Sequence, residues 1–378
     1  MILYFSSATN QDTFNELFKK GLISGACPAQ NFNYNIIEGL SRFEKVFSIS
    51  AVPYNDVDVD SFCLEKGNVQ YYTIANKKGK LRKISNIIQL TNESKSIIKK
   101  NDVKYIICDA ISTSANIVAH KISKEYNIPC IAIITDIPSI MNHGNTGRLD
   151  KMLENIMTKY DGYVFLTEAM SEYINKNNKP YIIIEGLFNF NDKDINVDKK
   201  EHICMYSGAI WKNSGFEEMI NGFEMANKSD MQLHIYGDGD GKDGVVKLCD
   251  KYENVKYMGC VSLDEIRRKQ RQAYLLVNPR KSVNEYTKYS FPSKTMEYMS
   301  SGTPSLMTKL PGIPEEYYKY VYTVENESAE GFCDAFKKIF EQTEENLEKK
   351  GKDAQDFIFE NKNSLVQTQR LYDFIQGI

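Results

Sequence analysis

The sequence has no long hydrophobic run and no large surplus of charge of one sign. Its longest apolar stretches, such as 130–134 and 181–184, are far shorter than the roughly 20 residues that a membrane-spanning helix needs. The formal net charge of −3 gives no bulk electrostatic reason to bind nucleic acid. The first residues, MILYFSSATNQ, lack the basic and apolar regions of a secretory signal, so we expect a cytoplasmic protein.

Cysteine motifs and two nucleotide-binding motifs are also missing. None of the eight cysteines forms a CxxC pair, and several lie in apolar strand-like stretches, which predicts buried free thiols. The absence of GxxxxGK[ST] argues against an NTPase P-loop. The segment GDGDGKDG has the wrong glycine spacing for the GxGxxG fingerprint, and its aspartates would repel a pyrophosphate. We therefore expect no NAD site.

What is present is an alternation of short apolar strands with helical patterns, which predicts parallel sheets built from βαβ units. A chain of 378 residues should form two domains. We expect an N-terminal domain (1–190), a polar linker (191–201), a C-terminal domain (202–358), and a final helix (359–378) that packs back on the N-terminal domain. Two facing doubly wound domains would leave a cleft in which ligands bind beyond the carboxyl ends of the strands.

Twelve strands are expected, six in each half of the chain. The expected strands are 2–5, 46–50, 105–108, 130–135, 162–166, 181–184, 203–207, 232–236, 255–258, 274–277, 305–307 and 321–324.

Residues 278–312, NPRKSVNEYTKYSFPSKTMEYMSSGTPSLMTKLPG, form the most informative stretch. They predict a strand end, a polar loop, and a short helix that begins near Pro292 and ends at Gly302. A basic, hydroxyl-rich loop that leads into a helix N-terminus is suited to an anion such as a diphosphate. Glu297 follows Pro292 by just over one turn and can reach a ligand held there.

Two other strand-to-helix turns accompany this loop. They are Ser207-Gly208-Ala209, which continues through Lys212, and the glycine-rich turn that begins at Gly237. Each turn alone is common in this fold class, because glycine permits tight geometry. Together with the loop after Val277 they would line one edge of a single sheet, where a nucleotide diphosphate would bind.

These residues resemble the GT-B-fold retaining glycosyltransferases of family four (glycosyl transferases group 1), of the bacterial capsular and exopolysaccharide type. The resemblance is carried by four motifs, YSG (206–208), HIYGDG (234–239), NPR (278–280) and YSFPSKTMEYMSSGTP (289–304). The first half resembles the family's acceptor domain in architecture and in short pieces, ITDIP (134–138) and LTEAM (166–170).

The resemblance implies transfer of a sugar from a nucleotide-diphosphate donor, a UDP-sugar, to a saccharide or lipid-linked saccharide acceptor in surface polysaccharide synthesis. It implies front-face attack with retention, in which the departing phosphate helps to take the acceptor proton and the protein positions and stabilises the diphosphate. No cofactor and no metal are expected, although Asp238-Gly239-Asp240 has the form of a DxD motif. Lipid-linked acceptors imply peripheral contact with the inner face of the cell membrane. For this contact FNELFKKGL (14–22) is a candidate, and core packing explains the same pattern equally well.

Carried onto this sequence, the resemblance places the second glutamate of the family's E-x7-E motif at Glu297, on the ribose hydroxyls. Tyr289 stands where the first glutamate, which contacts the donor sugar, is expected, and Glu285 is a candidate substitute. Ala209 and Ser214 replace the two cations that usually neutralise the diphosphate.

Other residues must then neutralise the diphosphate and complete the two substrate sites. Arg280 is the first candidate, because a guanidinium can bind two phosphate oxygens, and Lys294 is the second, because the helix dipole favours an anion there. Asp136 follows a strand of the acceptor domain and would orient the acceptor hydroxyl or act as its base; a helix-capping or turn role is the alternative. The remaining donor-site candidates are Gly25, Gly208, Lys212, Gly237, Lys281, Phe291 and Ser293.

Two other functions stay open. A UDP-N-acetylhexosamine 2-epimerase would share the two-domain fold and the nucleotide pocket but isomerise the donor. A non-catalytic partner subunit of a transferase would also show the loss of the first glutamate and of both cations. The sequence does not indicate the oligomeric state.

Overall fold

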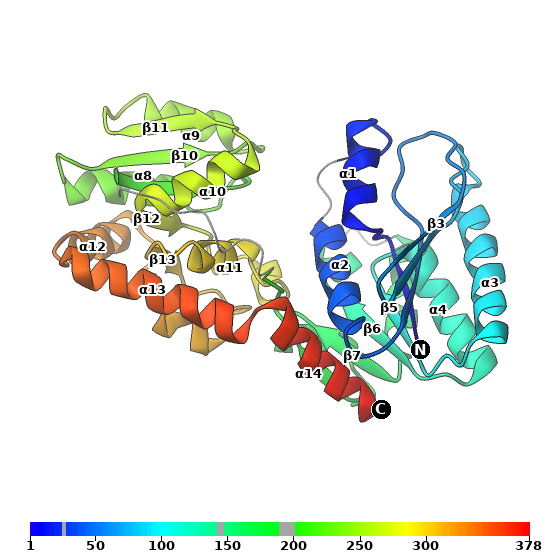
Figure 1. Cartoon of the computed structure of the whole chain (residues 1–378). Coiled ribbons are helices and arrows are strands. Elements are labelled where there is room, and N and C mark those ends of the chain that lie inside the picture. Colours follow the sequence, from blue (N-terminus) through cyan, green and yellow to red (C-terminus); the bar gives the residue numbers. More distant parts are fainter. Residues whose placement is uncertain (25–27, 142–146, 189–200) are drawn as a thin grey trace. The chain divides into compact units, whose positions relative to one another are not determined.

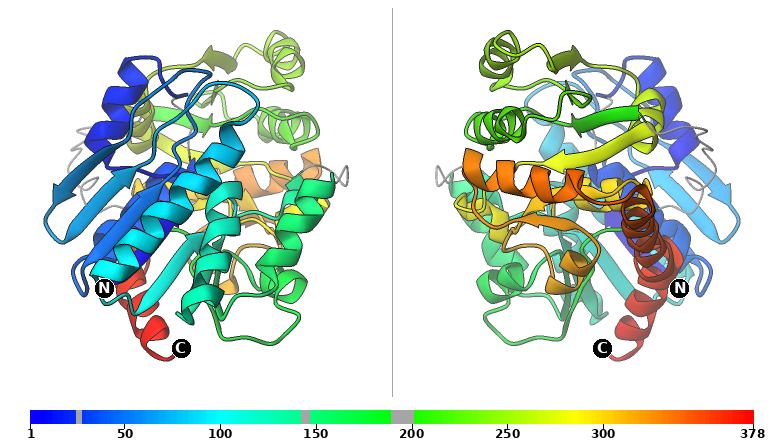
Figure 2. Two further views of the ribbon diagram at one scale, coloured as in Figure 1. Left: turned by 90° about the vertical axis from the view of Figure 1, so that its right-hand side faces the viewer. Right: turned by 90° about the vertical axis from the view of Figure 1, so that its left-hand side faces the viewer.

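The structure is a computed structural model, which describes residues 1–24, 28–141, 147–188 and 201–378 (Figures 1 and 2). The chain divides into unit 1, Met1–Asn189 with Ser364–Ile378, and unit 2, Phe190–Asn363. Gly25 and most of the predicted linker lie outside the described residues, and Glu201 is already the first residue of a strand.

Unit 1 is built on an eight-stranded sheet of order β3-β4-β2-β1-β5-β6-β7-β8. All neighbouring strands are parallel except β3, which is antiparallel to β4. The strands in the middle of the sheet are buried along their whole length, as expected for parallel strands that are covered on both faces. The strands are β1 (Ile2–Ser6), β2 (Val46–Ser50), β3 (Phe62–Lys66), β4 (Val69–Thr73), β5 (Tyr105–Asp109), β6 (Cys130–Ile134), β7 (Gly162–Phe165) and β8 (Tyr181–Ile183).

The helices of unit 1 include the last helix of the chain. They are α1 (Gln11–Lys19), α2 (Pro28–Leu40), α3 (Arg82–Lys100), α4 (Thr113–Tyr126), α5 (Pro138–Met141), α6 (Arg148–Met157), α7 (Glu168–Ile174) and α14 (Ser364–Gln376). Helix α14 packs on α2 and β8, and its Leu371 and Ile375 are fully buried in the core of unit 1. Burial of one such side chain stabilises the fold by about 1.5–3 kcal/mol.

Unit 2 has a six-stranded, entirely parallel sheet of order β11-β10-β9-β12-β13-β14. Its strands are β9 (Glu201–Ser207), β10 (Gln232–Tyr236), β11 (Val255–Gly259), β12 (Ala273–Asn278), β13 (Ser305–Thr308) and β14 (Tyr322–Val324). Its helices are α8 (Phe216–Ala226), α9 (Lys242–Cys249), α10 (Leu263–Gln272), α11 (Ser293–Ser300), α12 (Ala329–Phe340), α13 (Glu344–Asn361) and the 3₁₀ turns η2 (Glu285–Lys288) and η3 (Glu315–Lys319).

Each sheet has a point at which the strand order reverses, between β1 and β5 in unit 1 and between β9 and β12 in unit 2. Ligands of doubly wound sheets bind beyond the carboxyl ends of the strands at such switch points. The two switch points therefore indicate where a ligand would bind in each unit.

The predicted α/β class with two parallel-sheet units is confirmed. All twelve expected strands are present with bounds shifted by at most two residues, but β3 and β4 were not expected. The seven cysteines that the structure describes are free thiols, and two of them, Cys63 and Cys260, are exposed rather than buried as predicted. No helix in the described ranges has the length and apolar character needed to cross a bilayer.

Candidate functional site

Two strand-to-helix turns meet backbone to backbone at the switch point of unit 2. The amide of Gly208 donates to the carbonyl of Tyr236 (3.0 Å), and the amide of Ile210 donates to that of Asp238 (2.9 Å). Gly237 has φ = 132°, and a Cβ atom there would lie 1.8 Å from the Gly208 carbonyl oxygen. The predicted site residues Gly208 and Gly237 therefore lie in contact, and only glycine at position 237 allows so close an approach.

The two aspartates of the second turn bind backbone amides. Asp240 Oδ1 accepts from the amide of Lys212 (2.9 Å), and Asp238 Oδ1 accepts from that of Gly239 (2.8 Å). Within the described ranges, no group of three or more His, Cys, Asp or Glu side chains is placed to hold a metal ion. Asp240 therefore joins the two turns, whereas Asp238 binds within its own turn. The side chain of Lys212 is exposed.

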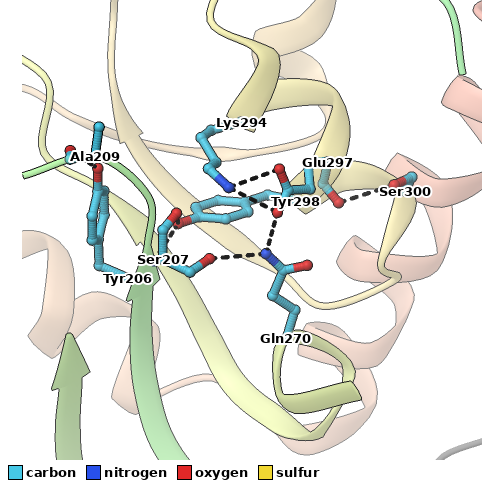
Figure 3. A network of polar contacts seen from close by, with 8 residues as sticks. All are labelled: Tyr206, Ser207, Ala209, Gln270, Lys294, Glu297, Tyr298 and Ser300. Carbon is cyan, nitrogen blue, oxygen red and sulfur yellow. Dashed lines mark hydrogen bonds and ion pairs between the residues drawn. The ribbon is translucent and has the colours of Figure 1, made fainter. Parts of the chain in front are cut away.

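Glu297 is held on both carboxylate oxygens by neighbouring side chains (Figure 3). Lys294, one turn earlier in α11, places Nζ 2.9 Å from Oε1 and 2.8 Å from Oε2. Gln270 Nε2 lies 2.5 Å from Oε1 and also 2.9 Å from the Ser207 hydroxyl at the end of β9. Glu297 and Lys294 each keep 27% of the side chain exposed, so the pair remains accessible to a ligand.

Tyr298 fixes α11 to the end of β9. Its hydroxyl accepts from the amide of Ser207 (2.9 Å) and donates to the carbonyl of the same residue (3.2 Å). The Tyr298 side chain is fully buried, so this connection is shielded from water (Figure 3). The first turn of α11 is therefore held beside Gly208, where a Cβ atom would lie 2.9 Å from Lys294 Cε.

Gln270 is a residue of this candidate site that the sequence interpretation did not include. It is 1% exposed, and its carbonyl accepts from the Thr303 hydroxyl (2.8 Å). It lies in a strongly charged helix, α10, of which it is the only buried residue. The available signal was its spacing of four residues from Ile266, which places both side chains on the same face of the helix.

The other predicted cations have different surroundings. Arg280 lies over the ring of Tyr286, 4.7 Å from its centroid, and donates to the Ser290 hydroxyl (3.4 Å). Lys281 Nζ is 2.5 Å from Glu218 Oε1 of α8, so its charge is already paired. Burial raises the pKa of Tyr206. The charge of Arg280 opposes this shift and the charge of Glu297 adds to it, so the side chains of Tyr206, Arg280 and Glu297 lie near the same turn.

Glu285 and Tyr289 are brought together around Lys288, a cation that the motif comparison did not select. Glu285 is 73% exposed, with its carboxylate 3.3 Å from Lys288 Nζ, and this ammonium lies 4.9 Å from the centroid of the Tyr289 ring. Phe291, in contrast, is buried with its ring centroid 5.2 Å from that of Tyr317, whereas Ser293 is exposed at the start of α11.

A second set of polar groups lies at the switch point of unit 1 and centres on Asp109, the last residue of β5. Its Oδ2 accepts from Asn33 Nδ2 (3.2 Å) and from the Ser7 hydroxyl (3.5 Å), and its Oδ1 accepts from the amide of Ile111 (3.2 Å). Burial, with a smaller contribution from the charge of Asp136, raises the pKa of Asp109 to about 6 despite these hydrogen bonds.

The predicted acceptor-site residue Asp136 follows the neighbouring strand β6. Burial also raises its pKa to about 6. Two carboxyl groups with raised pKa values thus lie at the ends of adjacent strands, an arrangement that is typical of acid–base sites. In the sequence, Asp109 is marked as a candidate only by its position at the end of a predicted strand.

The comparisons with known proteins can now be set beside this geometry. Residues 201–342, which hold every donor-site candidate of unit 2, match the family described as Glycosyl transferases group 1. No curated protein matches the chain in sequence. Similar solved structures include Anabaena Alr3699/HepE in complex with UDP, which is 11% identical with a TM-score of 0.67 over 100% of each chain. They also include the E. coli structure described as trehalose-6-phosphate bound with UDP-2-fluoro glucose (10% identical, TM-score 0.71) and the apo lipopolysaccharide outer core galactosyltransferase WaaB (14% identical, TM-score 0.64), each over 100% of this chain and 99% of the other.

The two α/β units and these structural neighbours define a chain with the GT-B fold, as predicted. Its second unit carries a glycosyl transferases group 1 domain. Fold and domain together support a glycosyltransferase.

Proposed function

We propose that the chain is a retaining glycosyltransferase of family four that transfers a sugar from a UDP-sugar to a saccharide or lipid-linked saccharide in surface polysaccharide synthesis. The observation that carries the proposal is the Lys294–Glu297–Gln270 cluster at the switch point, within the residues that match glycosyl transferases group 1. Two structural neighbours hold UDP or UDP-2-fluoro glucose and a third is a lipopolysaccharide galactosyltransferase, which supports a UDP-sugar donor and a saccharide acceptor.

Glu297 binds the ribose hydroxyls in this proposal, because a carboxylate accepts strong hydrogen bonds from two neighbouring hydroxyls. In the structure its oxygens accept hydrogen bonds from Lys294 and Gln270. Gln270 is buried and stays in place when the nucleotide binds, so it keeps the carboxylate in the orientation that the ribose requires. Lys294 is partly exposed and carries its ammonium on a flexible stem, so it turns to the diphosphate.

The diphosphate binds at the N-terminus of α11. Pro292, the N-cap residue, makes no side-chain capping hydrogen bond, and the first turn contains no acidic residue. The amides and the positive end of the helix dipole are thus suited to an anion. Lys294 and Arg280 add positive charge beside this end, and no metal is needed in the proposal. Lys281 contributes less, because Glu218 already neutralises it.

Transfer follows the front-face course that the family resemblance implies. The leaving diphosphate takes the acceptor proton. Stabilisation of the negative charge on this diphosphate by the protein supplies most of the rate enhancement. Asp136 orients the acceptor hydroxyl by accepting its hydrogen bond. With a pKa of about 6 it is largely ionised at neutral pH, so its carboxylate accepts this hydrogen bond while the proton passes to the leaving diphosphate.

The test is a screen of nucleotide-sugar donors with the full chain. Calorimetry with UDP, GDP and dTDP should give tight binding of UDP, and transfer from a UDP-sugar should yield a product with the anomeric configuration of the donor. An inverted product refutes the retaining mechanism. Epimerisation of a UDP-sugar without acceptor refutes transfer as the function.

One observation favours a second function, that of a non-catalytic partner subunit. Tyr289 replaces the expected acid, Ala209 and Ser214 replace the expected cations, and Lys281 is already paired. Such a subunit would bind none of the three nucleotides in the same calorimetry experiment, whereas the transferase requires that one of them bind.

A further inference from the structure

A basic and apolar surface lies at the start of helix α3, on unit 1. Residues 77–88, which we call the α3 tip, have the sequence KKGKLRKISNII. Three large aliphatic side chains of the α3 tip are exposed, Leu81 at 72%, Ile84 at 55% and Ile88 at 55%. Their spacing of three and four residues places them on one face of the helix. The core-facing side is supplied by other residues, which are Leu90, Ser94 and Ile97.

The α3 tip is also the site of a strong local charge. It contains five cations, Lys77, Lys78, Lys80, Arg82 and Lys83, in a chain whose net charge is −3, so the rest of the chain carries −8 (−3 − 5). Two acids lie beside it and bind its backbone rather than its ammonium groups. Asp58 Oδ1 accepts from the amide of Lys78 (2.9 Å), and Asp56 Oδ1 accepts from that of Gly79 (3.0 Å). A charge of +3 (5 − 2) therefore remains on this surface.

The end of the helix adds to this positive potential. The N-cap residue of α3 is Leu81, which makes no capping hydrogen bond, and the first turn contains no acidic residue. A polar N-cap residue such as Ser or Asp would stabilise the helix more. An exposed leucine at this position, between cations, is instead suited to a surface that is apolar inside and negatively charged outside.

We propose that the α3 tip docks on an anionic lipid bilayer. Leu81, Ile84 and Ile88 enter the boundary between headgroups and acyl chains, and the lysines bind the lipid phosphates. Aliphatic side chains set among lysines favour a bilayer over nucleic acid, which is recognised by aromatic and arginine contacts. The net negative charge of the rest of the chain keeps its other surfaces away from the same membrane.

This assignment differs from the segment that the sequence indicated. In helix α1 the apolar residues Phe14 and Leu17 are buried in a small cluster of unit 1, which leaves Phe18 exposed at 52%. Lys20 of the same segment is 2.5 Å from Glu16 and already paired. The left view of Figure 2 shows α3 (cyan) along the face of unit 1. Helix α3 follows β4, which is parallel to β2, so its N-terminus lies at the edge of the sheet where Asp109 ends β5 and Asp136 follows β6.

The proposal goes beyond the transferase function, because vesicle binding is measured without substrate. We would sediment the full chain with phosphatidylcholine vesicles, with and without phosphatidylglycerol. Each lysine near an anionic surface contributes about fivefold in affinity, so Lys77→Gln/Lys80→Gln/Lys83→Gln should weaken binding about 100-fold. Leu81→Ser/Ile84→Ser/Ile88→Ser should also abolish most of the binding.

Two control variants separate the α3 tip from bulk charge and from α1. Lys99→Gln/Lys100→Gln/Lys121→Gln removes three exposed cations elsewhere on unit 1, and Phe18→Ser/Lys19→Gln/Lys20→Gln removes the exposed groups of the α1 segment. Both should bind within about twofold of the unchanged chain. All substituted side chains at the α3 tip are exposed, so the thermal unfolding midpoint should not change.

Four results would overturn the proposal. They are absence of binding to the anionic vesicles, equal binding to neutral ones, equal loss in either control variant, and a dimer in sedimentation velocity that the serine variant converts to a monomer. The last result would assign the surface to a second copy of the chain.

Discussion

Gln270 offers the sharpest test of the donor site, because one buried amide connects two parts of it. Its Nε2 group donates to Glu297 (2.5 Å) and to the Ser207 hydroxyl (2.9 Å). Gln270→Leu keeps the approximate volume of the side chain and removes both hydrogen bonds. We expect this variant to weaken UDP binding and to leave the fold intact.

The magnitude follows from the type of hydrogen bond that is lost. A hydrogen bond to a charged group contributes about 1.5–3 kcal/mol, and one between neutral groups contributes about 1 kcal/mol. If Glu297 needs Gln270 to keep its orientation for the ribose, the first bond is lost from binding, which corresponds to about 10- to 100-fold in affinity. Both bonds are made in the folded chain, so their loss also lowers the unfolding free energy, by about 1 kcal/mol for the neutral bond and about 1.5–3 kcal/mol for the bond to the carboxylate.

Calorimetric titration with UDP and thermal unfolding of the same samples measure the two effects separately. The matched control is Gln272→Leu, two residues later in α10, where the amide oxygen only accepts a 3.5 Å contact from Arg268. This variant should bind UDP within about twofold of the unchanged chain. If Gln270→Leu lowers stability while the UDP dissociation constant stays within about twofold, Gln270 only supports the fold and the reasoning is refuted.

Three further predictions concern charge. Glu297→Gln should weaken UDP binding at least tenfold, since a neutral amide accepts weaker hydrogen bonds from the ribose, and calorimetry that shows unchanged affinity would contradict the ribose assignment. Arg280→Ala/Lys294→Ala should weaken UDP binding by more than tenfold and have little effect on uridine binding, and equal losses for UDP and uridine would contradict phosphate contact. Lys281→Ala should change UDP affinity less than threefold, because Lys281 is already paired with Glu218. Burial raises the pKa of Asp136 to about 6, so its protonated form stabilises the fold below about pH 4 and this contribution is lost as the pH rises through about 6. Asp136→Asn should therefore gain unfolding free energy relative to the unchanged chain, by about 2 kcal/mol, between about pH 4 and pH 7.5 in urea titrations, and a constant difference across that range would contradict the raised pKa.

The fold could be read from the sequence because it depends on local patterns. Apolar strands that alternate with helices identify a parallel α/β fold, and the stretch 289–304 identifies the donor unit. The strands β3 and β4 were not predicted from the sequence. Strand β3 is an edge strand with almost no buried side chain, and β4 alternates buried and half-buried residues over only five positions.

The candidate site was predictable only where its residues lie in one motif. Glu297 and Lys294 are three residues apart and were found together, whereas Gln270 reaches Glu297 from another helix, 27 residues earlier in the chain. Lys281 was selected by its place in the loop, but Glu218, 63 residues away, decides its charge environment. Contacts of this kind depend on tertiary packing, which neither spacing nor composition encodes.

The C-terminal helix also determines how the chain can be divided. Unit 1 is completed by Ser364–Ile378, so the polypeptide passes between the units twice, and the amide of Ser364 donates to the carbonyl of Phe188 (2.8 Å) where both passages leave unit 1. A protease that cuts one passage leaves the other intact, and the nicked protein should migrate as one species until it is denatured. A fragment that stops before α14 loses the buried Leu371 and Ile375, so unit 1 can be produced alone only as a permuted chain in which α14 is joined to it.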